Sequence, residues 1–135
     1  MEFVDTNILI YANDRSAGRK RDLAGALLMR LTDRDEGALS IQVLTEFYAA
    51  VTRKRILPDR DALEILWDYS HWAVHHPGIE HLMDAAELRV RFGLAWFDAL
   101  ILNSAIQLGC TTLWTEDFSD GQKFGDLTIR NPFAA

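Results

Sequence analysis

Four acidic residues lie in apolar surroundings at widely separated places in the sequence. Asp5 and Asp117 each follow a short apolar run that has the composition of a strand. Glu46 and Asp98 lie within longer apolar stretches that have helical spacing. Ligand sites of open α/β sheets form at the carboxyl ends of the strands. We therefore expect the four carboxylates to meet at that edge of a sheet.

Several carboxylates in one place raise each other's pKa and resist ionisation. A hard divalent cation removes this conflict, since Mg²⁺ and Mn²⁺ prefer oxygen ligands. Such a cation lowers the pKa of a bound water and polarises a phosphoryl oxygen, so the set suits hydrolysis of a phosphodiester. Each residue also has a structural alternative as a helix cap, a surface charge or half of a salt bridge. Asp98 in particular can be a charge that complements a helix dipole.

Alternating strands and longer helices must position these residues. Apolar runs predict strands over 2–5, 38–41 and 111–115, with a last edge strand over 127–129. Periodicity predicts helices over 7–12, 19–33, 42–54, 59–73, 79–92 and 97–108, with a turn over 75–78 and a polar loop over 116–126. This order indicates an α/β fold with a parallel sheet covered on both faces. No linker or repeat interrupts the chain, so residues 1–135 form one predicted domain.

Composition sets further bounds on the protein. A chain of 135 residues can bury a sizeable core, and no apolar run approaches the ~20 residues of a membrane span. We expect no signal peptide, and the single Cys110 suits a reducing cytoplasm as a buried small hydrophobe. The net charge of −6 is uneven, since residues 1–60 hold ten Lys and Arg against nine Asp and Glu. Charge therefore does not exclude a nucleic-acid partner.

The motifs that carry the acidic residues resemble those of the PIN-domain ribonucleases, and most closely the VapC toxins of type II toxin–antitoxin pairs. They cover essentially the whole chain in order: Phe3-Val4-Asp5-Thr6-Asn7-Ile8-Leu9, Thr45-Glu46-Phe47, Phe97-Asp98-Ala99-Leu100-Ile101 and Thr115-Glu116-Asp117-Phe118. The resemblance implies a three-layer α/β/α sandwich with a central, mainly parallel sheet. It also implies a cytoplasmic, Mg²⁺- or Mn²⁺-dependent endoribonuclease that inhibits translation. Its implied partners are RNA, a cognate antitoxin and a second copy in a homodimer, with no membrane.

The resemblance assigns roles to individual residues. Asp5, Glu46, Asp98 and Asp117 form the catalytic pocket, and Asp5, Asp98 and Asp117 hold the metal. Asn7 orients a pocket carboxylate, and Thr115 supports the pocket from the strand edge. The implied reaction is in-line attack by water, which leaves a 5′-phosphate and a 3′-hydroxyl. We interpret Asp120 as a solvated loop residue.

Two further surfaces follow from residue types. RNA needs cations near the pocket, and the candidates are Arg15, Arg19, Lys20, Arg53 and Arg55, all of which can equally be ordinary solvated charges. The aromatic residues Trp67, Tyr69 and Trp72 can line a groove for a protein partner or lie in the core.

Three other functions fit the sequence less well. A haloacid-dehalogenase-like phosphatase would need an Asp two residues after the first one, where this chain has Asn7. A non-catalytic PIN-like scaffold that binds protein or RNA would have no use for four pocket carboxylates. A DNA nuclease of the wider PIN group would need extra elements for which the chain has little room.

Overall fold

The computed structural model describes residues 1–134, and its centre is a six-stranded sheet in the order β3-β2-β1-β4-β6-β5. All strand pairs are parallel except β5 with β6. The strands are β1 (Glu2–Val4), β2 (Gly37–Ser40), β3 (Ala73–His75), β4 (Thr112–Trp114), β5 (Lys123–Phe124) and β6 (Leu127–Arg130). The chain leaves β1 toward β2 and β3 on one side, and β4 returns to the other side of β1. The carboxyl ends of β1 and β4 therefore flank a switch in strand order, the usual place for a ligand site.

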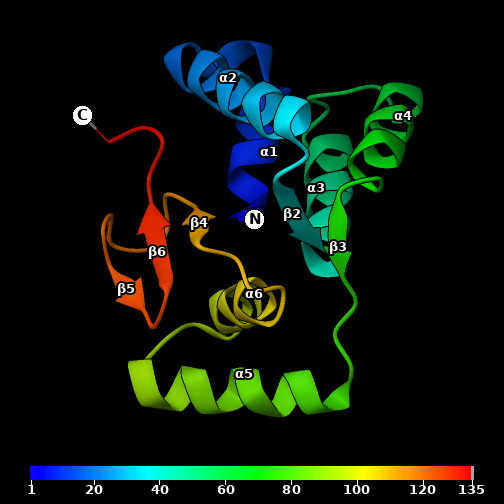
Figure 1. Cartoon of the computed structure of the whole chain (residues 1–135). Helices are drawn as coiled ribbons and strands as arrows, with labels where there is room; N and C mark the ends of the chain where they lie inside the picture. Colours follow the sequence, from blue (N-terminus) through cyan, green and yellow to red (C-terminus); the bar gives the residue numbers. More distant parts are fainter. Residues whose placement is uncertain (135) are drawn as a thin grey trace.

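Helices cover both faces of the sheet. Figure 1 shows α1 and α2 on one side of the sheet and α5 and α6 on the other. The helices are α1 (Thr6–Ala12), α2 (Arg19–Arg34), α3 (Ile41–Arg53), α4 (Asp59–Tyr69), α5 (Ile79–Phe92) and α6 (Trp96–Gln107), with a short 3₁₀ turn at Arg15–Ala17. The predicted α/β/α sandwich with a mainly parallel sheet is confirmed. None of the helices within residues 1–134 is long and apolar enough to cross a membrane.

Local signals in the sequence set the ends of the helices near the strand edge. Asp5 is the N-cap of α1, and Ser40 at the end of β2 caps α3 by accepting a hydrogen bond from the Val43 amide at 3.2 Å. Both helices thus start directly from strand ends. Gly109 has a φ of +70° just beyond α6, a left-handed conformation that glycine adopts without strain.

The core lies on both faces of β1, β2 and β4. Phe3, Leu39, Phe47, Leu102 and Leu113 are completely buried there. Burying large apolar side chains of this kind contributes about 1.5–3 kcal/mol each, so the core holds rigid the strand ends that carry the acidic residues. Cys110 is buried, as predicted.

Four predicted elements differ from the structure. The helix over 59–73 ends at Tyr69, and residues 73–75 form β3 rather than leading into a turn at His75. In β3 the His75 side chain is buried, with Nδ1 2.8 Å from the Ser104 hydroxyl. The loop over 116–126 contains β5, so the 127–129 strand is not an edge strand but pairs with both β4 and β5. These strands are only two to four residues long, too short to give a period-two pattern.

Candidate active site

Asp5 lies buried where β1 passes into α1, with 5% of its surface exposed. One carboxylate oxygen accepts from the Thr6 amide at 2.7 Å, and the other accepts from the Thr115 hydroxyl at 2.8 Å. The Thr115 hydroxyl in turn accepts from the Asp117 amide at 3.1 Å. These contacts join the carboxyl ends of β1 and β4, and they fix the orientation of the Asp5 side chain.

Glu46 reaches the same edge from α3. One of its oxygens accepts from the Thr6 hydroxyl at 3.0 Å and the other from the Gln42 amide at 2.8 Å. Gln42 also donates to the backbone carbonyl of Phe97, the residue before Asp98. The α3 and α6 helices are therefore linked at the point where each carries an acidic residue.

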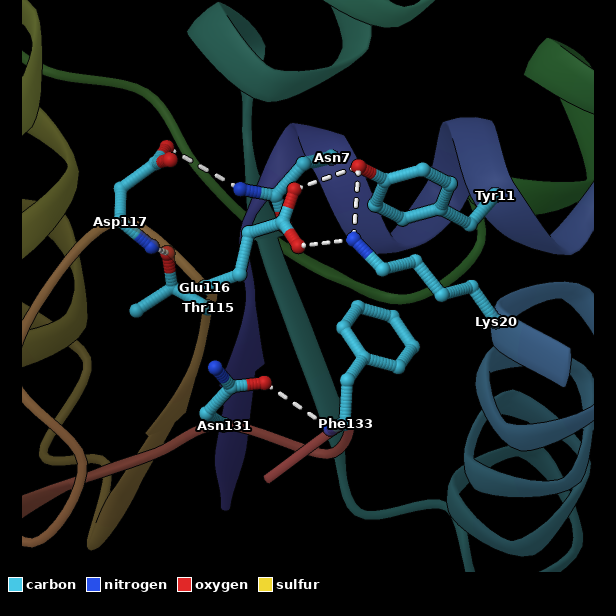
Figure 2. Close-up of polar contacts among 8 residues, drawn as sticks. All are labelled: Asn7, Tyr11, Lys20, Thr115, Glu116, Asp117, Asn131 and Phe133. Carbon is cyan, nitrogen blue, oxygen red and sulfur yellow. Dashed lines mark hydrogen bonds and ion pairs between the residues drawn. The ribbon is translucent and has the colours of Figure 1, made fainter. Parts of the chain in front are cut away.

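Asp117 is exposed in the segment after β4. Its Oδ2 accepts from the Asn7 side-chain amide at 3.0 Å, a contact between α1 and this segment that is drawn in Figure 2. Asp117 is thus held beside the start of α1, at a residue two positions after Asp5. This hydrogen bond is the kind of contact predicted for Asn7, which was expected to orient a pocket carboxylate.

Electrostatics show that the four carboxylates share one neighbourhood. Burial raises the pKa of Asp5 from 3.8 to about 7, against hydrogen bonds from Thr115 and Thr6 that lower it. The charges of Asp117 and Glu46 raise this pKa further. Burial also raises the pKa of Asp98, and the same two charges, of Asp117 and Glu46, add to that effect. The charges of residues from four distant parts of the sequence therefore act on one another at this strand edge.

The donor set fits a hard divalent cation. It consists of carboxylate oxygens whose mutual repulsion a cation would relieve. The buried Oδ1 of Asn7 has no hydrogen-bond partner within residues 1–134, which leaves an acceptor free beside Asp117. In that part of the chain, no three His, Cys, Asp or Glu side chains are close enough to hold one ion together. Mg²⁺ usually binds through one or two carboxylates and keeps several waters. A site in which the other carboxylates contact the ion through water therefore suits Mg²⁺.

Lys20 was expected to be a free cation near the pocket, and the structure differs. Its ammonium group forms a 2.9 Å ion pair with Glu116, so it is not an unpaired charge waiting for RNA. The pairing was hidden in the sequence because Glu116 lies 96 residues away. The other predicted RNA-binding residues are exposed and have no ion pair within the described residues 1–134: Arg15, Arg19, Arg53 and Arg55.

The predicted aromatic groove contains only one of its three expected residues. Trp67 is 66% exposed and lines an apolar groove of about 570 Å³ between α3 and α4, together with Ile41, Tyr48 and Leu63. Tyr69 and Trp72 instead pack against the core. The sequence did not separate these because all three fall on or near one helix.

Sequence reasoning gave no role to three polar residues of the site. Thr6 and Gln42 hold Glu46, and Glu116 binds Lys20 and Tyr11. Gln42 was detectable in principle, since it lies four residues before Glu46 on the same helix face. The contacts of Thr6 and Glu116 span 40 residues or more and required the fold.

A model of the PIN domain family matches residues 3–119. The chain belongs to the PIN domain family. No curated protein is similar enough in sequence to be matched to this PIN domain. The family resemblance found in the motifs is thereby confirmed.

Three solved structures share the fold of this PIN domain. A toxin–antitoxin complex from Klebsiella pneumoniae has a TM-score of 0.74 and 21% identity, with 100% of both chains covered. VapC20 from Mycobacterium tuberculosis, a toxin that cleaves the sarcin–ricin loop, has a TM-score of 0.68 and 19% identity, over 87% of this chain and 92% of its own. VapBC2 from Rickettsia felis, bound to a promoter DNA fragment, has a TM-score of 0.69 and 22% identity, over 96% and 97%. At such identities the likeness concerns the fold.

Proposed function

We propose that this PIN domain is a Mg²⁺- or Mn²⁺-dependent endoribonuclease and the toxin of a VapBC-type toxin–antitoxin pair that inhibits translation. The observation that supports the proposal is that Thr115 links Asp5 to Asp117 by hydrogen bonds, while the charges of Glu46 and Asp117 raise the pKa of both Asp5 and Asp98. A scaffold gains no stability from such repulsion. The fold shared with VapC20, which cleaves the sarcin–ricin loop, supports the same proposal.

The carboxylates would divide the work of the reaction. Asp5, Asp98 and Asp117 would hold the cation, one or two of them directly and the rest through water. When bound, the cation supplies positive charge for the phosphoryl oxygens and lowers the pKa of the attacking water. Asp98 accepts no side-chain or backbone hydrogen bond within residues 1–134, so its oxygens are free to bind ligands.

The remaining residues would orient these groups. Thr115 and the Thr6 amide fix Asp5, while Thr6 and Gln42 hold Glu46 toward the substrate side. Glu46 would then take a proton from the attacking water. In-line attack breaks the bond from phosphorus to the 3′ oxygen, and leaves a 5′-phosphate and a 3′-hydroxyl.

Cleavage of total RNA by the purified protein tests the proposal. We expect Mn²⁺- or Mg²⁺-dependent cutting that EDTA abolishes and that Asp5→Asn reduces at least a hundredfold. Asp120→Asn is the matched control, because Asp120 is exposed and its one hydrogen bond within residues 1–134 is accepted from the Asn131 amide at 2.8 Å. Binding of Mn²⁺ without cutting would indicate a scarce RNA substrate, whereas absence of both would favour a non-catalytic scaffold.

An antitoxin is the partner we propose for the groove between α3 and α4. The complexes from Klebsiella pneumoniae and Rickettsia felis show that chains of this fold assemble with other proteins. The groove leaves Leu63 and Trp67 exposed, and it reaches Ile41, the residue before Gln42 in the acidic site. A bound segment could therefore cover apolar surface and approach the pocket. Trp67→Ala should weaken the cognate complex at least tenfold in a calorimetric titration and leave RNA cleavage intact; loss of cleavage would contradict this assignment.

A homodimer through α5 is the assembly we propose. Ile79, Met83 and Val90 lie on one face of this helix and are 69%, 60% and 76% exposed. Large exposed apolar patches often mark protein–protein contact sites. Val90→Glu should convert a dimer into a monomer in light scattering, and a wild-type monomer would contradict the proposal.

A further inference from the structure

The segment after β4 touches α1 at two consecutive residues. Asp117 accepts from Asn7 at 3.0 Å, and Glu116 accepts from the Tyr11 hydroxyl at 2.5 Å. Asn7 and Tyr11 are four residues apart on α1 and therefore lie on the same helix face. Figure 2 shows both donors directed at this segment. The two contacts together set the register between α1 and the segment that carries Asp117.

Lys20 completes the attachment of Glu116 from α2. Its ammonium lies 2.9 Å from the second oxygen of Glu116 and 3.4 Å from the Tyr11 hydroxyl. The same ammonium lies 4.7 Å from the centre of the Tyr11 ring and 5.2 Å from that of Phe133. The Phe133 ring packs edge-on against Tyr11, with centroids 5.3 Å apart. Both donors to Glu116 are thus held by further contacts, and Figure 2 shows them gathered around its carboxylate.

Glu116 differs from the carboxylates of the acidic pocket because its charge is paired with Lys20. Its side chain points to Tyr11 and Lys20, away from Asp117, and Lys20 neutralises it. A carboxylate accepting a hydroxyl and an ammonium forms strong, directional hydrogen bonds. An exposed ion pair alone would contribute little, so the geometry, more than the charge, is what this contact provides.

We propose that Glu116, held by Tyr11 and Lys20, is a positioning residue that fixes the orientation of Asp117 in the acidic pocket. This inference rests on the proposed nuclease function for its effect on catalysis. Its geometric part is independent, because the hydrogen bond from Asn7 to Asp117 can be observed without any activity. Groups that orient metal-site carboxylates typically change affinity or activity 10–100-fold when removed.

Tyr11→Phe is the decisive variant, because it removes only the hydroxyl and changes no charge. Tyr69→Phe is the matched control, since it removes a tyrosine hydroxyl that contacts α1 at its other end, where it accepts from the Asn13 side-chain amide at 2.9 Å. We expect Tyr11→Phe to lower kcat about tenfold with KM nearly unchanged, and to weaken Mn²⁺ binding about tenfold in calorimetry. The side-chain amide signal of Asn7 should shift and exchange faster in NMR spectra. Tyr69→Phe should leave all three measurements unchanged.

Lys20→Met provides a second, independent variant. A positioning role predicts that it lowers kcat as Tyr11→Phe does, although it changes the local charge. A rise in KM with a weaker salt dependence, at unchanged kcat, would instead identify Lys20 as an RNA phosphate contact and overturn the proposed role. Equal behaviour of Tyr11→Phe and Tyr69→Phe would also overturn it. If the wild type cuts no RNA, the proposed function fails, and the Asn7 signal still decides whether Glu116 positions Asp117.

Discussion

Replacing Asp5 by Asn should make the metal-free protein more stable at neutral pH. Asp5 is 95% buried, and burial together with the charges of Asp117 and Glu46 raises its pKa from 3.8 to about 7. One pKa unit corresponds to about 1.4 kcal/mol. The shift therefore amounts to about 4 kcal/mol that the folded protein loses when this carboxyl ionises. Asn has the same shape and never ionises, so it avoids this cost.

The sign of the pH dependence follows from proton binding. Between about pH 4 and pH 7 the folded protein keeps a proton on Asp5 that the unfolded chain has released, so stability falls as pH rises. The contribution of Asp5 is fully present below pH 4 and is lost above pH 7. The advantage of Asp5→Asn should thus grow from near zero at pH 4 to a plateau above pH 7. Imperfect hydrogen bonding of the amide to Thr6 and Thr115 would subtract about 1 kcal/mol.

Urea denaturation in EDTA, followed by circular dichroism, measures this difference. We expect Asp5→Asn to be about 3 kcal/mol more stable than wild type at pH 8 and nearly equal at pH 4.5. For a chain of this size that corresponds to a melting temperature roughly 10 °C higher. Asp120→Asn, at an exposed site, should show no such change. The reasoning would be refuted if Asp5→Asn were no more stable than wild type at pH 8. It would also be refuted if the stability gain over wild type were the same at pH 8 and pH 4.5.

Further predictions concern the support of Asp5 and the packing of glycines. Thr115→Val removes the hydroxyl that lowers the pKa of Asp5; this pKa should rise, and kcat/KM should fall about tenfold, whereas an unchanged kcat/KM would show that the hydroxyl is dispensable. Gly37→Ala would place a Cβ 2.3 Å from the Trp72 ring, so we expect a loss of about 1–3 kcal/mol in urea unfolding. Gly25→Ala meets open space within α2 and should instead gain about 0.5–1 kcal/mol; the opposite order of these two variants would contradict the packing.

The sequence predicted the parts of the fold whose signals are local. The helix over 79–92 has the predicted bounds because apolar spacing marks its length and Gly93 ends it in a left-handed conformation. β3 was missed because it is three residues long and only His75 in it is buried. Short strands of this kind are fixed by their neighbours in the sheet, and the sequence alone does not contain that information.

In the candidate site, too, the sequence predicted the features with local signals and missed those that depend on contacts between distant segments. Asp5 and Asp117 were found because apolar strands precede them, and their convergence follows from the parallel sheet. The ion pair of Lys20 with Glu116 could not be found, since it joins segments 96 residues apart. The contacts that orient the carboxylates are likewise side-chain geometry, which no spacing rule predicts.

A calorimetric titration of Mn²⁺ tests most directly whether the four carboxylates form one metal site. Wild type would be compared with Asp5→Asn, Glu46→Gln, Asp98→Asn and Asp117→Asn, with Asp120→Asn as the control. We expect one class of Mn²⁺ site that the three Asp variants weaken at least tenfold, while Glu46→Gln reduces RNA cleavage more than affinity. Unchanged Mn²⁺ affinity in all the Asp variants, or no binding by the wild type, would contradict a metal-dependent nuclease at this strand edge.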